Sequence, residues 1–269
     1  MLRVGRIADK RVRSLLRTYL RAGVCILVVA VAAIWWFLEY APLPAALCEQ
    51  PHLTGVYLDA KGRTLAELAS SEARAHRPCA LREMGPWIPR ITMGLEDRRF
   101  YQHHGVDLRA TFRALIRRRG GGSTITQQFV KVATKRKGRS IIAKAREALW
   151  ALQLERRWTK HQILEAYLNR ISYGNRLIGV EAAALAYFDK PASALSQAEA
   201  IYLAGLPQRP SQLNPWTYPE AAGRQFARCI QTLERRGELL ANEISKEDLP
   251  SVGRNLPPIQ APHFVQRGP

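Results

Sequence analysis

The sequence predicts a mainly α domain that is held by one N-terminal transmembrane helix. Three observations lead to this fold class. Residues 22–38 form an uninterrupted apolar run, "AGVCILVVAVAAIWWFL". From about residue 86 onward, apolar side chains recur at helical spacing and polar residues fall between them. Strand-like sequence is confined to one short stretch, "GVYLDAKGRTLAEL" at 55–68.

The first 40 residues predict a basic cytoplasmic segment, 1–21, and a transmembrane helix, 22–40. The apolar run is close to the roughly 17–25 residues that a helix needs to cross a bilayer. Because basic flanks stay in the cytoplasm and Trp35, Trp36 and Tyr40 resemble an interfacial aromatic belt, we expect a single-pass protein of the cytoplasmic (inner) membrane. Its N-terminus would be cytoplasmic and its main domain periplasmic or otherwise extracytoplasmic. A cleaved signal peptide is the alternative, but its apolar region usually ends in a small-x-small site rather than in Trp-Trp-Phe-Leu-Glu.

The net charge of the chain indicates which kinds of molecule it is expected to bind. The net charge is +19 and the pI is about 10.4, which favours anionic partners such as nucleic acid, phospholipid or a phosphorylated substrate. Nucleic acid is disfavoured because the domain is predicted to lie outside the cytoplasm. In that compartment Cys48 and Cys79 could form a disulfide, which the sequence leaves open.

The rest of the chain divides by composition into three parts. Residues 41–85 predict a proline-rich stalk that contains one short β-hairpin. Residues 86–245 predict one helical domain. Residues 246–269 are rich in proline and glycine and are predicted to be an extended tail.

Two helix starts inside the domain are marked by side-chain capping patterns. Thr159 precedes Gln162 by three positions, and Ser196 precedes Glu199 by the same spacing. This is the spacing of a capping box, in which each of the two side chains satisfies a free backbone N–H of the first helical turn. Helices are therefore predicted to begin at these two places.

One stretch in the domain combines acids, aromatics and histidines: "LEDRRFYQHHGVD", residues 95–107. Adjacent Glu96 and Asp97 raise each other's proton affinity, which is one way to make a general base that works near neutral pH. Phe100 and His103 follow within the same loop. The alternative is an ordinary helix end whose acids only complement the helix dipole.

A second carboxylate, Glu147, lies in a predicted helix three residues after Lys144. Such a pair is often only a surface ion pair of small energetic value. Glycosyl chemistry, however, commonly uses two carboxyl groups. The sequence does not show whether Glu96 and Glu147 meet in space.

The third candidate segment is "GGSTITQQFVK", residues 121–131. Glycines followed by hydroxyl side chains at a helix entry suit a phosphate or a sugar. The segment lacks the Gly-Lys-Ser/Thr core of a nucleotide-binding loop, so ATP is not expected. The polar side chains that it offers are Ser123, Thr124, Gln127, Gln128 and Lys131.

Together these segments resemble the peptidoglycan glycosyltransferase (transglycosylase) family, which occurs as monofunctional enzymes and as the N-terminal module of class A penicillin-binding proteins. The motif EDxxFxxHxG is matched at Glu96, Asp97, Phe100, His103 and Gly105. The motif GxSTxTQQ is matched at Gly121, Ser123, Thr124, Thr126, Gln127 and Gln128. The motif ILExYLN is matched at Ile163, Leu164, Glu165, Tyr167, Leu168 and Asn169. The resemblance runs from about Pro86 to about Gly237.

The resemblance implies a lysozyme-like, two-lobed fold. It also implies a polymerase that joins lipid II units into β-1,4 glycan strands. The reaction would invert the configuration at C1 of the donor MurNAc and release undecaprenyl pyrophosphate. It implies catalytic roles for Glu96 and Glu147, with Glu96 as the base. The substrate contacts that it implies are Asp97, Phe100, His103, Ser123, Thr124, Gln127, Gln128, Lys131, Lys144 and Asn169. It allows Mg²⁺ or Mn²⁺ to bridge the pyrophosphate and implies no organic cofactor. The expected partners are lipid II, the lipid-linked growing glycan chain and the membrane.

Two departures from the family pattern qualify the resemblance. The motif RKxxE is matched at Lys144 and Glu147, but Ala143 stands at the usual arginine, where Arg139 or Arg146 could substitute. No Ser-x-x-Lys acylation motif follows the domain, so we expect no transpeptidase activity and a separate transpeptidase as partner. The chain would then be a natural monofunctional form or a truncated bifunctional one. The competing functions are a catalytically weak lipid II-binding scaffold and a lysozyme-like peptidoglycan hydrolase.

Overall fold

The computed structural model describes residues 2–49, 54–58, 60–61, 64–68, 73–117, 122–135, 140–240 and 243–255. Three of the predictions above concern residues outside this part: Gly121 of the second motif, Arg139 as a substitute cation, and most of the extended tail, from residue 256 onward. The chain divides into two compact units, Met1–Leu43 and Pro44–Pro269, which are described separately below.

The first unit is one continuous helix, α1 (Leu2–Tyr40). It extends the predicted transmembrane helix through the basic segment, because nothing in residues 2–21 breaks a helix: the stretch contains no proline. Leu15–Tyr40 has a mean hydropathy of 2.2 and is long and apolar enough to cross a membrane. None of the apolar window within it is buried inside the structure, as expected of a helix whose partner is lipid.

The second unit begins with short elements. Helix α2 (Ala45–Cys48) is followed by strands β1 (Gly55–Leu58) and β2 (Thr64–Leu68), which pair antiparallel where the sequence indicated a hairpin. Strand β3 (Ala75–His76) pairs in parallel with the distant strand β4 (Leu177–Ile178). Cys48 and Cys79 are both free thiols.

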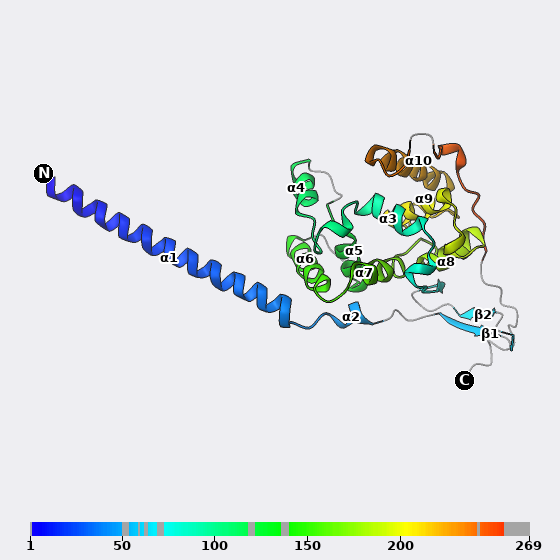
Figure 1. The fold of residues 1–269 in the computed structure, drawn as a ribbon, viewed down its shortest axis with the longest axis horizontal. Coiled ribbons are helices and arrows are strands. Elements are labelled where there is room, and N and C mark those ends of the chain that lie inside the picture. The colour runs from blue at the N-terminus through cyan, green and yellow to red at the C-terminus, as the bar shows by residue number, and fades with distance from the viewer. Residues whose placement is uncertain are drawn as a thin grey trace. The chain divides into compact units, whose positions relative to one another are not determined.

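In the described part of the second unit the remaining regular elements are helices, so the prediction of a mainly α fold is confirmed (Figure 1). The α-helices are α3 (Trp87–Glu96), α4 (Leu108–Arg117), α5 (Ile125–Ala133), α6 (Ile141–Glu155), α7 (Lys160–Leu168), α8 (Val180–Phe188), α9 (Gln197–Gly205) and α10 (Pro219–Arg236). Short 3₁₀ turns connect several of them: η1 (Leu81–Glu83), η2 (Phe100–Gln102), η3 (Ala192–Ala194), η4 (Leu206–Gln208) and η5 (Lys246–Asp248).

The two predicted capping boxes are confirmed. The Thr159 side chain accepts a hydrogen bond from the backbone N–H of Gln162 at the start of α7. The Ser196 side chain does the same with Glu199 at the start of α9. A third box, formed by Thr124 and Gln127, begins α5 inside the second motif. Such caps typically stabilise a helix by about 1 kcal/mol each, so local sequence fixes where these helices begin.

The helices pack as two groups, and this arrangement positions the site. Helix α5 packs against α6 and α7, whereas α9 packs against α3, α8 and α10. Figure 1 shows α3 between the helices α5, α6 and α7 and the helices α8, α9 and α10. Helix α9 is the centre of the second group, since its residues Ala200–Gly205 are all buried. A Cβ at Gly205 would lie 2.9 Å from Cys229 Sγ, so glycine here allows α9 and α10 to approach closely.

Candidate active site

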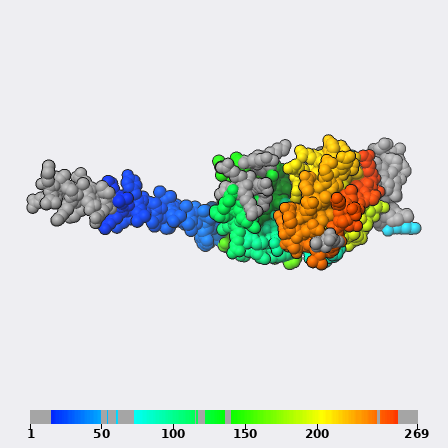
Figure 2. All heavy atoms as spheres, turned by 90° about the horizontal axis from the view of Figure 1, so that it is seen from above, coloured from blue at the N-terminus to red at the C-terminus, as the bar shows by residue number. Residues whose placement is uncertain are grey.

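A groove of about 1410 Å³ lies between the two helix groups. Helices α5 and α6 form one wall, η4 and α10 form the other, and the end of α3 contributes Leu95 and Glu96 between them. Figure 2 shows the surface hollowed between the green residues of the first group and the yellow and orange residues of α9 and α10. The predicted site residues that line it are Glu96, Ser123, Gln127, Gln128, Lys131, Lys144 and Glu147. Both predicted catalytic carboxylates therefore face one groove.

Glu96 is the last residue of α3, where the helix end delivers its side chain to the groove. Its Oε2 accepts a hydrogen bond from Gln128 Nε2 at 2.8 Å. Its Oε1 accepts one from Gln208 Nε2 at 3.0 Å. The first bond comes from α5 and the second from η4 across the groove, so Glu96 is held between the two walls by uncharged donors.

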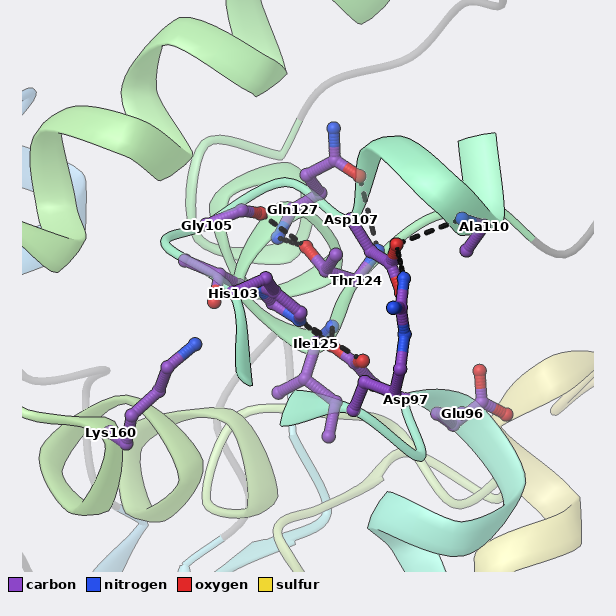
Figure 3. A network of polar contacts seen from close by, with 12 residues as sticks. Glu96, Asp97, His103, Gly105, Asp107, Ala110, Thr124, Ile125, Gln127 and Lys160 are labelled. Atoms are coloured by element: carbon purple, nitrogen blue, oxygen red, sulfur yellow. Dashed lines mark hydrogen bonds and ion pairs between the residues drawn. The ribbon is translucent and has the colours of Figure 1, made fainter. Parts of the chain in front are cut away.

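Asp97, the neighbour of Glu96, is buried, and its carboxylate accepts hydrogen bonds from within the domain. Its carboxylate lies 2.9 Å from His103 Nε2 and accepts the backbone N–H of Ile125 at 3.1 Å. Thr124 Oγ1 donates to the Gly105 carbonyl at 2.6 Å, which joins the same two segments again. Figure 3 shows this network and shows Glu96 directed away from it. The two motifs are thus fastened together beneath the groove, and Asp97, His103 and Thr124 are outside its lining.

Two other predicted substrate contacts are also placed away from the groove lining. Phe100 is fully buried, with Lys160 Nζ 4.4 Å from its ring centroid. Asn169 uses its amide on the backbone of Cys79, with Nδ2 donating to the carbonyl at 2.9 Å and Oδ1 accepting the N–H at 3.2 Å. We therefore expect Phe100 and Asn169 to act by holding the domain together rather than by touching substrate.

Lys144 and Glu147 form the polar centre of the first wall. Lys144 Nζ donates to Ser123 Oγ at 2.6 Å and to Glu147 Oε2 at 3.1 Å. Glu147 is only 4% exposed, whereas half of the Lys144 side-chain surface is exposed. The buried carboxylate thus orients an accessible ammonium group, and Lys131 adds a second cation on α5.

The position of Ala143 on α6 lies outside the groove lining. Arg146, one of the two cations considered as its substitute, also lies outside the lining and has its guanidinium 5.9 Å from the Trp150 ring centroid. In the part of the chain that the structure describes, Lys131 and Lys144 are therefore the cations of this wall.

The opposite wall carries basic residues that sequence reasoning missed. They are Arg209, Arg224, Arg228 and Arg236. Arg224 and Arg228 are four positions apart on α10 and so share one helix face. Arg236 donates to the Leu95 carbonyl at 2.8 Å, and burial lowers its pKa from the ordinary value of an arginine. The four-residue spacing was visible in the sequence, but nothing in it indicated that this face of α10 meets a groove.

Gln208 and Gln225 were missed as well. Gln208 reaches Glu96, and Gln225 Nε2 donates to Gln208 Oε1 at 3.0 Å. Glu96 and Gln208 are 112 positions apart, so spacing along the chain gave no signal for this contact.

No group of three or more His, Cys, Asp and Glu residues that could hold a metal ion occurs among the described residues. The described lining contains two carboxylates, Glu96 and Glu147, and Glu147 Oε2 lies 3.1 Å from Lys144 Nζ. Mg²⁺ commonly binds through one or two carboxylates together with substrate phosphates. These residues therefore fit a metal ion that is bound mainly by substrate phosphate oxygens, and not one that protein side chains coordinate on all sides.

Comparison with known proteins agrees with the motifs. A family model described as Transglycosylase matches residues 61–234. The chain is 30% identical to penicillin-binding protein 2D of Bacillus subtilis over 273 residues, which cover 96% of this chain and 39% of that protein. It is 32% identical to penicillin-binding protein 1A of Streptococcus oralis over 253 residues, covering 87% of this chain and 39% of that one. It is 44% identical to penicillin-binding protein 1A of Pseudomonas aeruginosa over 133 residues, covering 47% of this chain and 16% of that one.

The chain thus spans well under half the length of these relatives. The family match itself covers more than half of this chain and includes all the motif residues that line the groove. The chain therefore belongs to the transglycosylase family, as the motif resemblance predicted.

Proposed function

We propose that this groove is the active site of a peptidoglycan glycosyltransferase that polymerises lipid II. The observation that carries the proposal is the position of Glu96, a carboxylate in a large groove with cations on both walls. A polymerase of this kind must bind two lipid-linked pyrophosphates and remove one proton between them. A base between two cationic surfaces meets both needs.

In the proposed reaction, Glu96 accepts the proton of the 4-hydroxyl of the acceptor's N-acetylglucosamine. The hydroxyl oxygen attacks C1 of the donor's N-acetylmuramic acid, and the bond from C1 to the pyrophosphate oxygen breaks. Configuration at C1 inverts, which gives the β-1,4 linkage. The electron pair of the broken bond leaves with undecaprenyl pyrophosphate.

Lys131 and Lys144 would stabilise the charge that develops on the leaving pyrophosphate. Fixed cations that face the position of developing charge are an effective form of electrostatic catalysis, because they need little reorganisation during the reaction. Glu147 would keep Lys144 in place through their 3.1 Å contact. Ser123, Gln127 and Gln128 line the same wall and would position sugar and phosphate. A bound Mg²⁺ or Mn²⁺, with Glu147 as its protein ligand, would add positive charge at the pyrophosphate.

Arg224 and Arg228 on the opposite wall would bind the pyrophosphate of the second substrate. Arg224 pairs with Glu220 at 3.4 Å, and both side chains are largely exposed. Exposed pairs of this kind contribute about 0–1 kcal/mol, so the arginines remain available to an anion.

The substrate is a membrane lipid, and two features of the chain support a membrane location. Helix α1 is long and apolar enough to span a bilayer. On α4, Leu108, Phe112 and Ile116 recur every four residues on one face and are 77%, 63% and 66% exposed. We propose that α1 anchors the chain in the inner membrane with an extracytoplasmic domain, and that this α4 face contacts the lipid surface. The proposed reaction forms glycosidic bonds only, so we expect a separate transpeptidase to carry out peptide cross-linking.

The test is polymerisation of labelled lipid II by the full-length protein in detergent. The parent is compared with Glu96→Gln and with Glu247→Gln, an exposed glutamate of η5 outside the groove lining. We expect a product ladder from the parent and from Glu247→Gln that muramidase digests. The polymerisation rate of Glu96→Gln should fall by at least the roughly 10²–10⁴-fold that a general base contributes to the rate.

Each competing function predicts a different result. Polymerisation by Glu96→Gln at the parental rate would exclude Glu96 as the base. Binding of lipid II by the parent without a ladder would support the scaffold. Shortening of preformed glycan by the parent would support the hydrolase.

A further inference from the structure

Each oxygen of the Glu96 carboxylate accepts a hydrogen bond from a different primary amide. Gln128 Nε2 donates to Oε2 at 2.8 Å, and Gln208 Nε2 donates to Oε1 at 3.0 Å. Gln128 belongs to α5 and Gln208 to η4, so the two donors come from opposite walls of the groove. The amides restrain the carboxylate from both sides without adding charge.

Each of these amides is itself oriented by a buried donor. Tyr167 Oη donates to Gln128 Oε1 at 3.0 Å, and Gln225 Nε2 donates to Gln208 Oε1 at 3.0 Å. Because the amide oxygen is occupied in each case, the amide NH₂ group must face Glu96. Tyr167 is 2% exposed and Gln225 is 9% exposed. Burial raises the pKa of Tyr167 well above its ordinary value, so this hydroxyl keeps the proton that it donates.

Two hydrogen-bond chains therefore reach Glu96, one from Tyr167 through Gln128 and one from Gln225 through Gln208. They differ in how firmly the middle glutamine is held. Gln128 is partly buried on α5, a regular helix, whereas Gln208 is an exposed residue at the end of a short 3₁₀ turn. The exposed Gln208 side chain would lose rotamer freedom in this geometry, and solvent competes for its amide. Its bond from Gln225, a buried residue of α10, supplies the restraint.

A general base works only while it is directed at the proton that it removes. Glutamate has several rotatable side-chain bonds, so a solvent-exposed carboxylate samples many positions. The hydrogen bonds that run from Gln225 through Gln208 therefore restrain the direction of the Glu96 carboxylate.

We propose that Gln208 and Gln225 are positioning residues for the catalytic base, with Gln225 acting through Gln208 to hold Glu96 toward the acceptor hydroxyl. This inference rests on the proposed role of Glu96. Neither glutamine gains or loses a proton, and Gln225 touches no reacting atom.

The experiment measures kcat and KM of lipid II polymerisation with the full-length protein in detergent. The variants are Gln208→Ala, Gln225→Leu and the double variant. The matched control is Gln231→Ala, a glutamine of the same helix α10 that is exposed and outside the groove lining. Because Gln208 is exposed, Gln208→Ala should keep the fold and preserves the test if Gln225→Leu is destabilised.

We expect each single variant to lose about 10-fold in kcat, which is less than the 10²–10⁴-fold contribution of a general base, because the base itself remains. KM should change by less than about twofold, since no substrate contact is removed. The double variant should lose no more than Gln208→Ala, since both residues act through one hydrogen bond to Glu96.

Two results would overturn the inference. One is a parental kcat in both Gln208→Ala and Gln225→Leu. The other is a raised KM with unchanged kcat in Gln208→Ala, which would make Gln208 a substrate contact. Glu96→Gln, run alongside, separates the two levels of the argument: if it is inactive while both glutamine variants match the parent, only this inference fails. If it polymerises at the parental rate, the proposed function fails.

Discussion

Replacement of Asp97 by asparagine tests how the two principal motifs are held together. Asp97 is 6% exposed, and two donors converge on its Oδ2 oxygen: His103 Nε2 at 2.9 Å and the backbone N–H of Ile125 at 3.1 Å. Asparagine has one acceptor oxygen and an NH₂ group that only donates. An asparagine oxygen at the Oδ2 position keeps both bonds without the negative charge, and the NH₂ group then stands at the Oδ1 position, 3.1 Å from His103 Nε2, as a buried donor that faces another donor.

The size of the effect follows from these contacts. A buried donor left without a partner costs about 1–3 kcal/mol, and a hydrogen bond to a charged acceptor contributes roughly 1.5–3 kcal/mol. We take about 3 kcal/mol as the expected loss in the free energy of unfolding. For a domain of roughly 150–250 residues, 1 kcal/mol shifts Tm by about 2–4 °C, so we expect Tm to fall by about 6–12 °C.

The assay is thermal unfolding of the full-length protein in detergent, followed by tryptophan fluorescence. The control is Asp189→Asn, at an exposed residue with φ of 56° that ends α8. Asparagine adopts this left-handed conformation readily, so the control should stay within about 0.5 kcal/mol of the parent. A Tm for Asp97→Asn within 2 °C of the control would refute the reasoning.

Three further predictions follow from the same structure. Gly105→Ala should lower the free energy of unfolding by at least about 1–2 kcal/mol, which is the strain of a positive φ in a residue with a Cβ. The φ at Gly105 is 88°, and a Cβ there would lie 2.6 Å from the Ala151 carbonyl oxygen. Urea unfolding measures this loss, and an unchanged midpoint would contradict it. Burial alone would raise the pKa of Asp107, but the hydrogen bonds from the Ala110 N–H and from Arg99 lower it by more. The pKa of Asp107 therefore lies below its ordinary value. This stabilisation is complete above the unfolded pKa of about 3.9 and disappears as pH falls through the folded value. The difference in unfolding free energy between the parent and Asp107→Asn should therefore be full at pH 6 and shrink below about pH 4, and a difference independent of pH would rule out the carboxylate as its source. Deletion of residues 1–40 should weaken polymerisation of membrane-embedded lipid II more than of detergent-dispersed lipid II, and equal losses would exclude a delivery role for α1.

Much of the fold was predictable because it is encoded locally. An apolar run of membrane-spanning length marks α1, and the capping boxes at Thr159 and Ser196 mark the starts of α7 and α9. These signals depend on neighbours a few residues apart. The extent of α1 toward Leu2 was missed because basic residues are compatible both with a helix and with an irregular segment.

The sequence by itself also determined the family, because long ordered motifs are specific to it, and it predicted which residue types the site contains. Only the tertiary structure decided which of those residues face the groove. Glu96 lines it while the adjacent Asp97 is buried beneath it, and Gln128 lines it while Asn169 binds the backbone of Cys79. The same is true of Arg224, Arg228, Gln208 and Gln225, whose positions opposite Glu96 depend on the packing of α10 and α9. The physical reason is that a motif specifies local backbone geometry and side-chain chemistry, whereas the direction and partner of each side chain are set by helix packing between segments more than 100 positions apart.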